Sequence, residues 1–449
     1  MRVLEDASLK SLAIALAQLD AGFSELPALP PPTPADTARI AAVLSTVAAR
    51  LTDNYPYFHP LYAGQMLKPP HPIARAAYAL AMWLNPNNHA LDGGRASSHM
   101  EIEAVAALAK MFGLPQHLGH LTSGGTFANL EALWIAGKLN PGKKIVASAQ
   151  AHYTHSRICS VLGLDFATIA AAPNGAMDLT ALRTALAEEE VGTVVATLGA
   201  TATGAVDPLD EILALREQYG FRLHVDAAYG GYFTLAETLD PAVRRAFDAI
   251  AQADSVVVDP HKHGLQPYGC GCILFRDPAV GRFYKHDSPY TYFSSAELHL
   301  GEISLECSRP GASATALWAT QQLLPMERGG EFAHGLDSSL AAARDLYSRL
   351  AADTRFIVPA VPQLDIVVWA VRAADAAASS AAAHRVFTAA AEKGLHLALA
   401  DLPIEFFPAG TWPAASQSTV TCLRSVLMKP EHLDWLDHIW FLLQGSIHA

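Results

Sequence analysis

The placement of Lys262 in the sequence suggests covalent chemistry. The segment Ser255-Val-Val-Val-Asp-Pro-His-Lys262-His-Gly runs from an apolar stretch typical of a buried strand into a carboxylate and then a lysine. A lysine held at a strand end and partly removed from water can have a lowered pKa, so its amine can form a Schiff base with a carbonyl group. A lysine after a strand is more often a solvated loop residue, so the segment needs support from others.

Asp226 ends a second apolar run, Phe221-Arg-Leu-His-Val-Asp226-Ala-Ala228-Tyr-Gly-Gly. A pyridine cofactor such as pyridoxal 5′-phosphate (PLP) needs an acid beside its ring nitrogen, because a protonated ring is the stronger electron sink. Asp226 stands where such an acid would be needed, and Ala228 is small enough to lie against a flat ring. The alternative is an aspartate that caps the following helix.

A phosphate site is indicated by Leu121-Thr-Ser-Gly124-Gly125-Thr126-Phe-Ala-Asn129. Glycines and a hydroxyl at the start of an amphipathic helix offer free backbone N–H groups and the positive end of a helix dipole. An ordinary glycine-rich turn with a threonine cap would have the same sequence. The segment is not a nucleotide P-loop, because no Gly-Lys-Ser/Thr follows at the required spacing.

Two further segments place polar side chains after apolar runs. In Gln150-Ala-His152-Tyr-Thr-His-Ser156, His152 could stack on an aromatic cofactor, although any one of 19 histidines is more often incidental. In Ala196-Thr-Leu-Gly-Ala-Thr201-Ala-Thr-Gly204, Thr201 could contact a ring substituent.

The elements that must position these residues alternate between strand and helix. Apolar runs at 145–147, 193–198, 222–225 and 255–258 predict buried strands, and the segments 127–138, 155–162 and 209–219 predict helices between them. This alternation is typical of a largely parallel sheet with helices on both faces, and ligands of such sheets gather at the carboxyl ends of the strands. The fold class is therefore predicted to be α/β.

The sequence pattern changes after about residue 330, where strand-like runs at 365–371, 395–400 and 420–426 lie between alanine-rich helical segments. This pattern predicts a second, smaller α/β domain. The first 25 residues predict an amphipathic helix, and residues 54–72 are rich in aromatic residues and proline. We therefore expect an N-terminal segment (1–72), a large domain (73–330) and a small C-terminal domain (331–449).

Composition excludes several classes of protein. A formal net charge of −12 without a strong basic run argues against nucleic acid as a partner. No apolar run approaches the roughly 18 residues that a membrane span needs, and the N-terminus lacks a signal-peptide core. Five scattered cysteines form neither a disulfide framework nor a metal-ligand pattern. We expect a cytoplasmic protein without a membrane or metal partner.

The order of these motifs resembles the group II PLP-dependent amino-acid decarboxylases, which share the aspartate-aminotransferase fold (fold type I of PLP enzymes). TSGGTFANLEAL, AHYTHS, ATLGATATGAVDPL, HVDAAYGG and DPHKHG occur in family order between residues 121 and 264. The resemblance implies PLP held as a Schiff base on Lys262, Asp226 paired with the pyridine nitrogen, and His152 stacked on the ring opposite Ala228. It also implies contacts to the ring oxygen, phosphate or Schiff base from Thr201, Gly125, Thr126, Ser255 and His261.

The same resemblance implies decarboxylation of an L-amino acid to its amine and carbon dioxide. In the family, a tyrosine on a loop after the lysine assists protonation, and Tyr290 and Tyr292 are the candidates here, with dimer-interface packing as the alternative. A loop without this tyrosine would favour an oxidative outcome that forms an aldehyde. The same fold could also belong to a transaminase, an aldolase-type lyase or a non-catalytic PLP-binding protein.

For the substrate side, the resemblance indicates the aromatic cluster that includes Tyr57, Phe58 and His59, which favours an aromatic amino acid but could equally be structural. Arg424 matches a position where aminotransferase-type folds often hold the substrate α-carboxylate. The family is homodimeric, with the N-terminal helix reaching the partner, so a homodimer is expected.

Overall fold

The computed structural model describes residues 8–31, 33–285, 299–412 and 417–447, and its α/β architecture is built on two sheets. The large sheet has seven strands in the order β1-β7-β6-β5-β4-β2-β3. In chain order these are β1 (Leu118–Thr122), β2 (Lys144–Ser148), β3 (Phe166–Ile169), β4 (Val191–Thr197), β5 (Arg222–Asp226), β6 (Ser255–Val258) and β7 (Gly271–Phe275).

The large sheet is mostly parallel, as predicted. The neighbouring strands from β3 to β6 are all parallel, and β7 is inserted antiparallel between β6 and β1. All four strands predicted for this region are present within a residue or two of the expected bounds. Strands β1, β3 and β7 were not predicted.

Helices cover both faces of this sheet, because alternate residues of each strand point to opposite sides. Val257 of β6 packs with residues of helix α5, whereas Val256 and Val258 belong to the core on the other face, with residues of α8 and α9. The helices around the sheet are α4 (Leu91–Met111), α5 (Gly125–Leu139), α6 (Thr154–Leu162), α7 (Leu179–Glu188), α8 (Leu209–Tyr219), α9 (Pro241–Asp248) and α10 (Gly311–Leu323).

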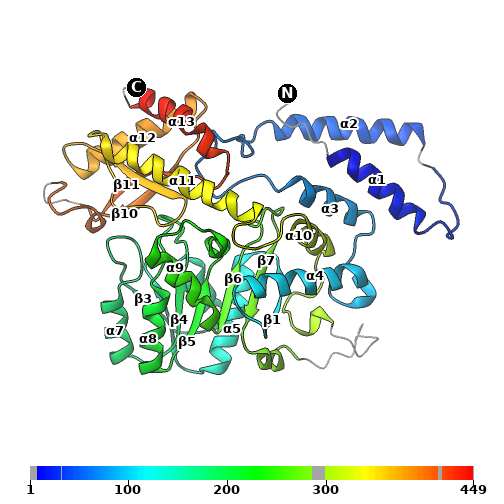
Figure 1. The fold of residues 1–449 in the computed structure, drawn as a ribbon, viewed down its shortest axis with the longest axis horizontal. Coiled ribbons are helices and arrows are strands. Elements are labelled where there is room, and N and C mark those ends of the chain that lie inside the picture. Colours follow the sequence, from blue (N-terminus) through cyan, green and yellow to red (C-terminus); the bar gives the residue numbers. More distant parts are fainter. Residues whose placement is uncertain (1–7, 32, 286–298, 413–416, 448–449) are drawn as a thin grey trace.

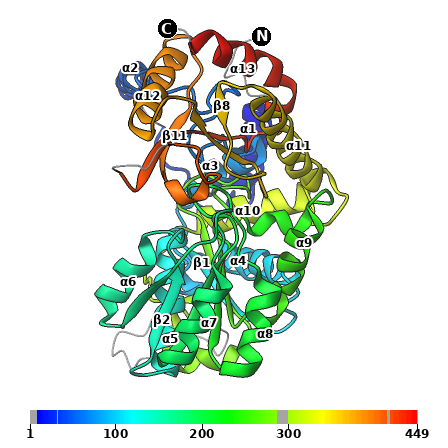
Figure 2. The same ribbon diagram turned by 90° about the vertical axis from the view of Figure 1, so that its left-hand side faces the viewer.

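The second sheet is antiparallel, with four strands in the order β10-β11-β9-β8. Its strands are β8 (Phe356–Ile357), β9 (Ile366–Val371), β10 (Ala398–Pro403) and β11 (Thr419–Val426), and its helices are α11 (Glu331–Ala352), α12 (Ala376–Glu392) and α13 (His432–Ser446). Helix α12 is the alanine-rich segment expected to be helical, and its inner face is buried. Figure 2 shows this unit above the large sheet.

The N-terminal helices form an arm that projects to one side of the molecule (Figure 1). The arm consists of α1 (Ser8–Ala21) and α2 (Pro34–Leu51), neither of which has a buried residue. Helix α1 contacts α3 (Pro72–Met82), through which the arm joins the rest of the chain. The division into domains at residues 72 and 330 remains a prediction.

The large sheet brings three chain segments to one edge. Parallel strands β4, β5 and β6 end side by side at Thr197, Asp226 and Val258, and the chain then continues to Lys262. Helix α5 starts at the same edge, at Gly125. The residues with candidate chemistry therefore meet at the carboxyl ends of the strands, as expected for this architecture.

Candidate active site

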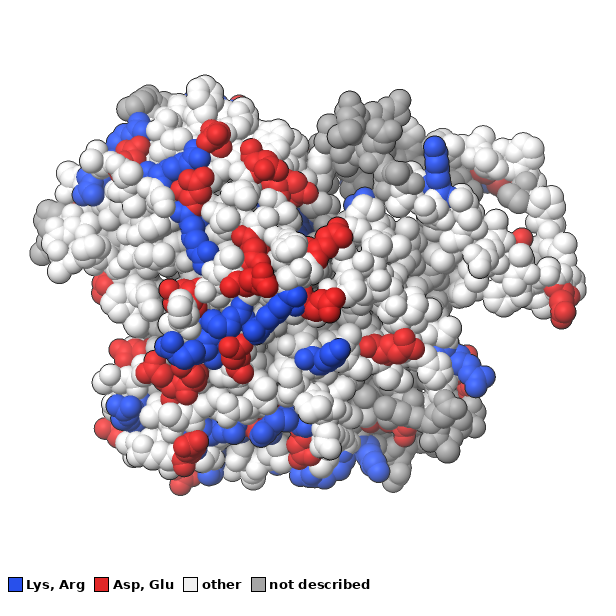
Figure 3. Space-filling model, viewed as in Figure 1, with Lys and Arg blue, Asp and Glu red and all other residues white. Residues whose placement is uncertain are grey.

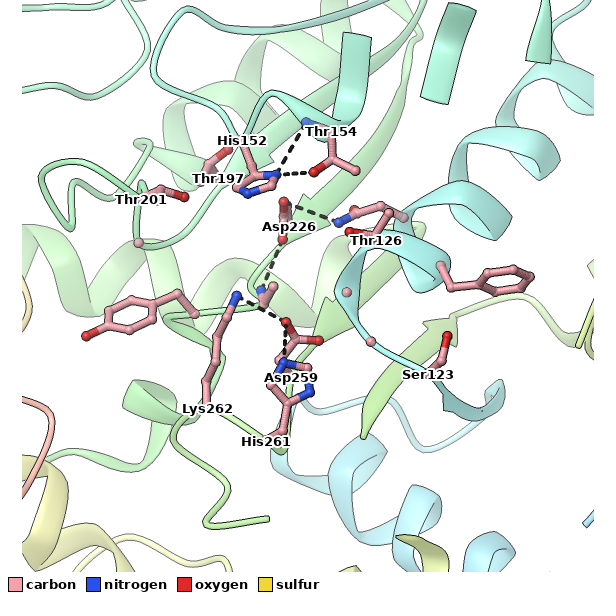
Figure 4. Close-up of a pocket in the computed structure, with 17 residues that line it drawn as sticks. Ser123, Thr126, His152, Thr154, Thr197, Thr201, Asp226, Asp259, His261 and Lys262 are labelled. Carbon is pink, nitrogen blue, oxygen red and sulfur yellow. Dashed lines mark hydrogen bonds and ion pairs between the residues drawn. The ribbon is translucent and has the colours of Figure 1, made fainter. Parts of the chain in front are cut away.

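A cavity of about 380 Å³ opens at the carboxyl edge of the large sheet (Figure 4). Its walls come from the start of α5, from the ends of β4, β5 and β6, and from the segment after β2. It is lined by Ser123, Gly124, Gly125, Thr126, Phe127, Asn129, His152, Thr154, Thr197, Gly199, Thr201, Asp226, Ala228, Tyr229, Asp259, His261 and Lys262.

Lys262 lies on the loop between β6 and β7, and its side chain points into the cavity (Figure 4). Its Nζ lies 3.0 Å from Oδ2 of Asp259, so the ammonium has a carboxylate partner in this structure. The loop is held at both ends, because the His261 N–H donates to the Cys270 carbonyl at 3.1 Å and the Lys262 N–H donates to the Asp259 carbonyl at 2.9 Å. Together these contacts fix the backbone from which the lysine side chain extends.

Asp226 lies at the floor of the cavity and is almost fully buried. Its carboxylate accepts hydrogen bonds from His155 Nε2 at 2.9 Å, from Asn129 Nδ2 at 3.4 Å and from the Ala228 N–H at 3.1 Å. Burial alone would raise the pKa of Asp226, but the hydrogen bond and charge of His155, the charge of Lys262 and the backbone N–H together lower it well below its usual value. Asp226 is therefore an ionised carboxylate over the whole physiological pH range.

His152 and Ala228 contribute two walls of the cavity. His152 Nδ1 contacts the Thr154 hydroxyl and accepts a hydrogen bond from the Thr154 N–H at 3.3 Å. Burial is the main reason that the pKa of His152 is lowered, so the ring is neutral at neutral pH. Because Nδ1 is an acceptor, the proton of the neutral ring is on Nε2. The small side chain of Ala228 leaves room beside Asp226 for a flat ring.

The start of α5 provides the expected anion cradle. Its N-cap residue is Gly124, so no side chain caps the first N–H groups of the helix. The approach of other chain segments is close here: a Cβ on Gly125 would lie 2.7 Å from Oδ2 of Asp259, and a Cβ on Gly271 would lie 2.5 Å from the Gly124 carbonyl carbon. Only glycine fits at these two positions without a shift of the neighbouring atoms.

Two threonines from one segment line the cavity. Thr201 is the predicted residue, and its carbonyl also accepts a hydrogen bond from Arg424 at 2.7 Å. Thr197, the last residue of β4, has a buried hydroxyl without a hydrogen-bond partner among the described residues. A buried hydroxyl usually has a partner, so Thr197 provides an unused donor and acceptor on the cavity wall.

These features fit PLP. The cavity combines a lysine amine, an ionised carboxylate, a small flat wall, an uncapped helix start and an unpaired hydroxyl. A pyridine aldehyde with a phosphate group requires such a set: an amine for its carbonyl carbon, an acid for its ring nitrogen, a donor for its ring oxygen and amides for its phosphate.

The structure does not bring Ser255 to the cavity. This residue is the first of β6, at the amino end of a strand whose carboxyl end faces the site. It is fully buried, and its Oγ lies 2.9 Å from His224 Nδ1. The expectation of a direct cofactor contact from Ser255 is therefore not supported, because one strand length separates it from the loop that carries Lys262.

The predicted substrate residues lie beside the small sheet and not in the cavity of the same chain. The Tyr57 ring packs edge-on against Tyr62, with centroids 4.9 Å apart, and the His59 ring packs against Trp435 at 4.7 Å. Phe58 is 38% exposed, and none of these residues lines the cavity. Tyr290 and Tyr292 lie outside the described residues.

Arg424 lies one layer behind the cavity. It is buried on β11, and its guanidinium donates to the carbonyls of Thr201, Ala202 and Gly64 and to the Gln65 side chain. Arg424 thus ties the small sheet to the loop after β4 and to the segment before α3. It holds a bridging position behind the threonine that lines the cavity.

Some lining residues were missed from the sequence. Asp259 and Thr197 directly follow or end a strand, which was the signal used for Asp226, and could have been found in the same way. Asn129 lies one turn into α5 from Gly125, on the side that faces β5, and was part of the glycine-rich motif without a role of its own. Tyr229 offered no signal beyond its place next to Ala228.

The sequence matches a known family over most of its length. Residues 42–372 match a family model described as the pyridoxal-dependent decarboxylase conserved domain. An L-tyrosine decarboxylase from Enterococcus faecium is 29% identical, and the match covers 67% of this chain and 66% of that protein. A probable L-tyrosine/L-aspartate decarboxylase from Methanothermobacter thermautotrophicus is 30% identical over 68% of this chain and 82% of that protein. The chain thus spans just under two thirds of the length of the Enterococcus protein.

The fold is also that of solved structures. A crystal structure of Oryza sativa TDC with PLP and tryptamine superposes with a TM-score of 0.77 at 19% identity, covering all of this chain and 99% of that one. At this identity the likeness establishes the architecture. It confirms the expected fold type.

Proposed function

Because the chain belongs to the family of pyridoxal-dependent decarboxylases, a family of PLP-dependent carboxy-lyases, we propose that it converts an L-amino acid with an aromatic side chain to its amine and carbon dioxide. The observation that carries the proposal is the convergence of Lys262 and the ionised Asp226 on one cavity beside an uncapped helix start.

The proposed roles follow from the chemistry of each side chain. Lys262 would hold the cofactor covalently through its amine, after its ammonium leaves Asp259 and loses a proton. Asp226 would accept a hydrogen bond from a proton on the ring nitrogen. The first amides of α5, with Gly125 and Thr126, would bind the phosphate.

When bound, PLP supplies an electron sink for the pair released as the bond between Cα and the carboxylate breaks. The ionised Asp226 would hold a proton on the ring nitrogen, which the sink requires. His152 lines the cavity, and its ring, with the proton on Nε2, would offer a donor to a substrate carboxylate. Tyr290 and Tyr292 remain the proposed proton donors at Cα.

An aromatic substrate is supported by the charge of the lining. Lys262 is the sole lysine or arginine among the lining residues, and its amine is assigned to the cofactor. Among the described residues that line this cavity, a substrate with a side-chain carboxylate would thus find no cation to pair with, whereas Phe127 belongs to the lining. The name of the Enterococcus relative agrees with this choice.

We also propose a homodimer, which the uncovered face of α2 supports. Ile40, Val43, Leu44, Val47 and Leu51 recur at helical spacing and are between 45% and 63% exposed. The arm is largely free of charged side chains on the face seen in Figure 3. Light scattering should give twice the chain mass, and Val43→Glu with Val47→Glu should give a monomer.

The experiment that tests the function is product analysis with purified protein and PLP. Tyrosine, phenylalanine, tryptophan, aspartate, glutamate and 2,4-diaminobutyrate are compared for carbon dioxide, amine and aldehyde. We expect equal amounts of carbon dioxide and amine, with the highest kcat/KM for an aromatic substrate. Lys262→Ala should abolish turnover and the visible absorption of bound cofactor, whereas Lys110→Ala, at an exposed position of α4, should change neither.

The opposite outcomes are also informative. Highest activity with aspartate or 2,4-diaminobutyrate would overturn the aromatic assignment, and aldehyde without amine would overturn simple decarboxylation. A Lys262→Ala protein that still turns over at the wild-type rate would refute the role of the lysine.

A further inference from the structure

A chain of hydrogen bonds leads away from the buried side of Asp226. Asn129 Nδ2 lies 3.4 Å from Asp226 Oδ2, and its Oδ1 lies 2.8 Å from Nε2 of His224. Nδ1 of His224 lies 2.9 Å from the Ser255 hydroxyl. On the other side, Nε2 of His155 lies 2.9 Å from Asp226 Oδ2. Ser255, absent from the cavity, is thus the far end of a chain that reaches Asp226.

Chemistry fixes the donor of each bond in this chain. Asp226 is ionised and can only accept, so the nitrogens of His155 and Asn129 that face it carry protons. The Asn129 oxygen must then accept from His224 Nε2–H. Burial lowers the pKa of His224 to about 3, so this ring is neutral and its Nδ1 accepts from the Ser255 hydroxyl. The assignment has no conflict at any atom.

His155 makes the shortest of the bonds to Asp226. It lies on α6, is 1% exposed, and its Nδ1 has no hydrogen-bond partner among the described residues. Without the imidazole, the carboxylate would keep only the longer bond from Asn129 and the N–H of Ala228. A carboxylate removed from water depends on such donors to stay ionised. Loss of His155 should therefore affect the ionisation of Asp226 more than loss of either other donor.

We propose that His155 is a positioning residue that, together with Asn129, His224 and Ser255, holds Asp226 ionised and aimed at the ring nitrogen of the cofactor. His155 does not line the cavity and acts only through Asp226. The inference rests on the proposed function only in requiring PLP in the cavity, and not on the identity of the amino acid.

The other charged and titratable groups around Asp226 set the direction of the effect. They come from the segment after β2, from β5 and from the loop after β6, and they are His152, His224, Asp259 and Lys262. His152 and His224 have lowered pKa values and are neutral, and Lys262 and Asp259 pair with each other. Loss of His155 therefore leaves burial as the dominant influence and raises the pKa of Asp226.

The test compares His155→Leu, which removes the donor, with His155→Gln, whose amide N–H can replace it. The first readout is the affinity of the cofactor-free protein for PLP, measured by absorption. The second is the pH at which the spectrum of bound cofactor changes on acidification. We expect His155→Leu to bind PLP roughly ten- to a hundredfold more weakly, the range for a lost hydrogen bond to a charged group.

The direction of the spectral change follows from the sign of the pKa shift. In the native protein Asp226 stays ionised down to low pH, so its acid transition lies at or below the lowest pH at which the protein remains folded. In His155→Leu the acid transition should move up in pH, and His155→Gln should restore most of the affinity and the native transition. Where turnover is measured, kcat should fall more than KM rises.

Two controls separate this role from general destabilisation. His432→Leu removes another buried histidine, near the small sheet, and should leave PLP affinity and the acid transition unchanged. Ser255→Ala removes the far end of the chain and should move the acid transition in the same direction as His155→Leu, by a smaller amount. If His155→Leu does not fold, the shift expected in Ser255→Ala is the deciding measurement.

Native PLP affinity and an unmoved acid transition in His155→Leu would overturn the proposal. If the leucine variant does not fold, an unmoved acid transition in Ser255→Ala would overturn it. These readouts need no turnover, so they stand even if no amino acid of the panel is decarboxylated.

Discussion

Substitution of Gly271 by alanine should weaken cofactor binding from behind the cavity wall. Gly271 starts β7 and lies against the turn that precedes α5. A Cβ at this position would lie 2.5 Å from the carbonyl carbon and 2.6 Å from the Cα of Gly124, and 2.7 Å from the Thr122 hydroxyl. Two of these atoms are backbone, so they cannot turn away as a flexible side chain can.

The size of the effect follows from the overlap. Carbon atoms in non-bonded contact lie about 3.5 to 4.0 Å apart, so Gly124 must move by about 1 Å. Insertion of a methyl group into a packed site typically costs about 1–3 kcal/mol. If this cost falls on the state with the cofactor phosphate bound at the start of α5, the dissociation constant for PLP rises roughly 5- to 150-fold.

The assay is titration of the cofactor-free protein with PLP, together with thermal unfolding of the same sample. Gly281→Ala is the matched control, because its Cβ would meet only Leu118 side-chain atoms, at an ordinary 3.6 Å. We expect weaker PLP binding and a lower Tm for Gly271→Ala alone. An alanine variant with native affinity and native Tm would refute the packing argument for the cradle.

Three other predictions concern charges and hydrogen bonds. Asp259→Asn removes the carboxylate that pairs with Lys262, so this variant should bind PLP faster in stopped-flow absorption measurements. A native binding rate would contradict the idea that the ion pair competes with the cofactor for the lysine. Arg424→Ala leaves the buried carbonyl of Gly64 and the less buried carbonyls of Ala202 and Thr201 without their donor. The variant should be less stable by about 1–3 kcal/mol, seen as a lower Tm, and a native Tm would contradict the bridging role. Burial would raise the pKa of Glu131, but the charge and hydrogen bond of His120, with hydrogen bonds from Tyr284 and the Leu305 N–H, together lower it. This carboxylate therefore stabilises the fold above its ordinary pKa of about 4.3, and the contribution is lost as pH falls below that value. Unfolding measured against pH should therefore be less acid-sensitive in Glu131→Gln, and a native pH dependence in that variant would contradict the linkage.

The central strands and the main site residues could be predicted from the sequence, because both depend on local patterns. Runs of apolar residues identify β4, β5 and β6, and in a parallel sheet the polar residues after such runs must meet at one edge. Asp226 and Lys262 follow directly from this rule. The same rule argues against Ser255, which begins its strand and was assigned to the site by resemblance alone.

Other features depend on contacts between distant parts of the chain. The aromatic rings at 55–62 identify an apolar segment, but they pack on the small sheet through contacts such as Tyr62 with His396, more than three hundred residues away. No local pattern specifies such a partner. The role of Asn129 was equally hidden, because a polar residue in a helix gives no sign that it will be buried between an aspartate and a histidine.

The antiparallel strand β7 has a consequence for how this enzyme can diverge. Because β7 returns beside β6, the loop with Lys262 is the closed end of a hairpin, tied by bonds such as that from the His261 N–H to the Cys270 carbonyl. The lysine proposed as nucleophile is thus placed by about twenty consecutive residues, whose closure costs little entropy. No described residue of the N-terminal arm or of the small sheet belongs to this hairpin, so both can change in sequence while the loop with Lys262 keeps its geometry.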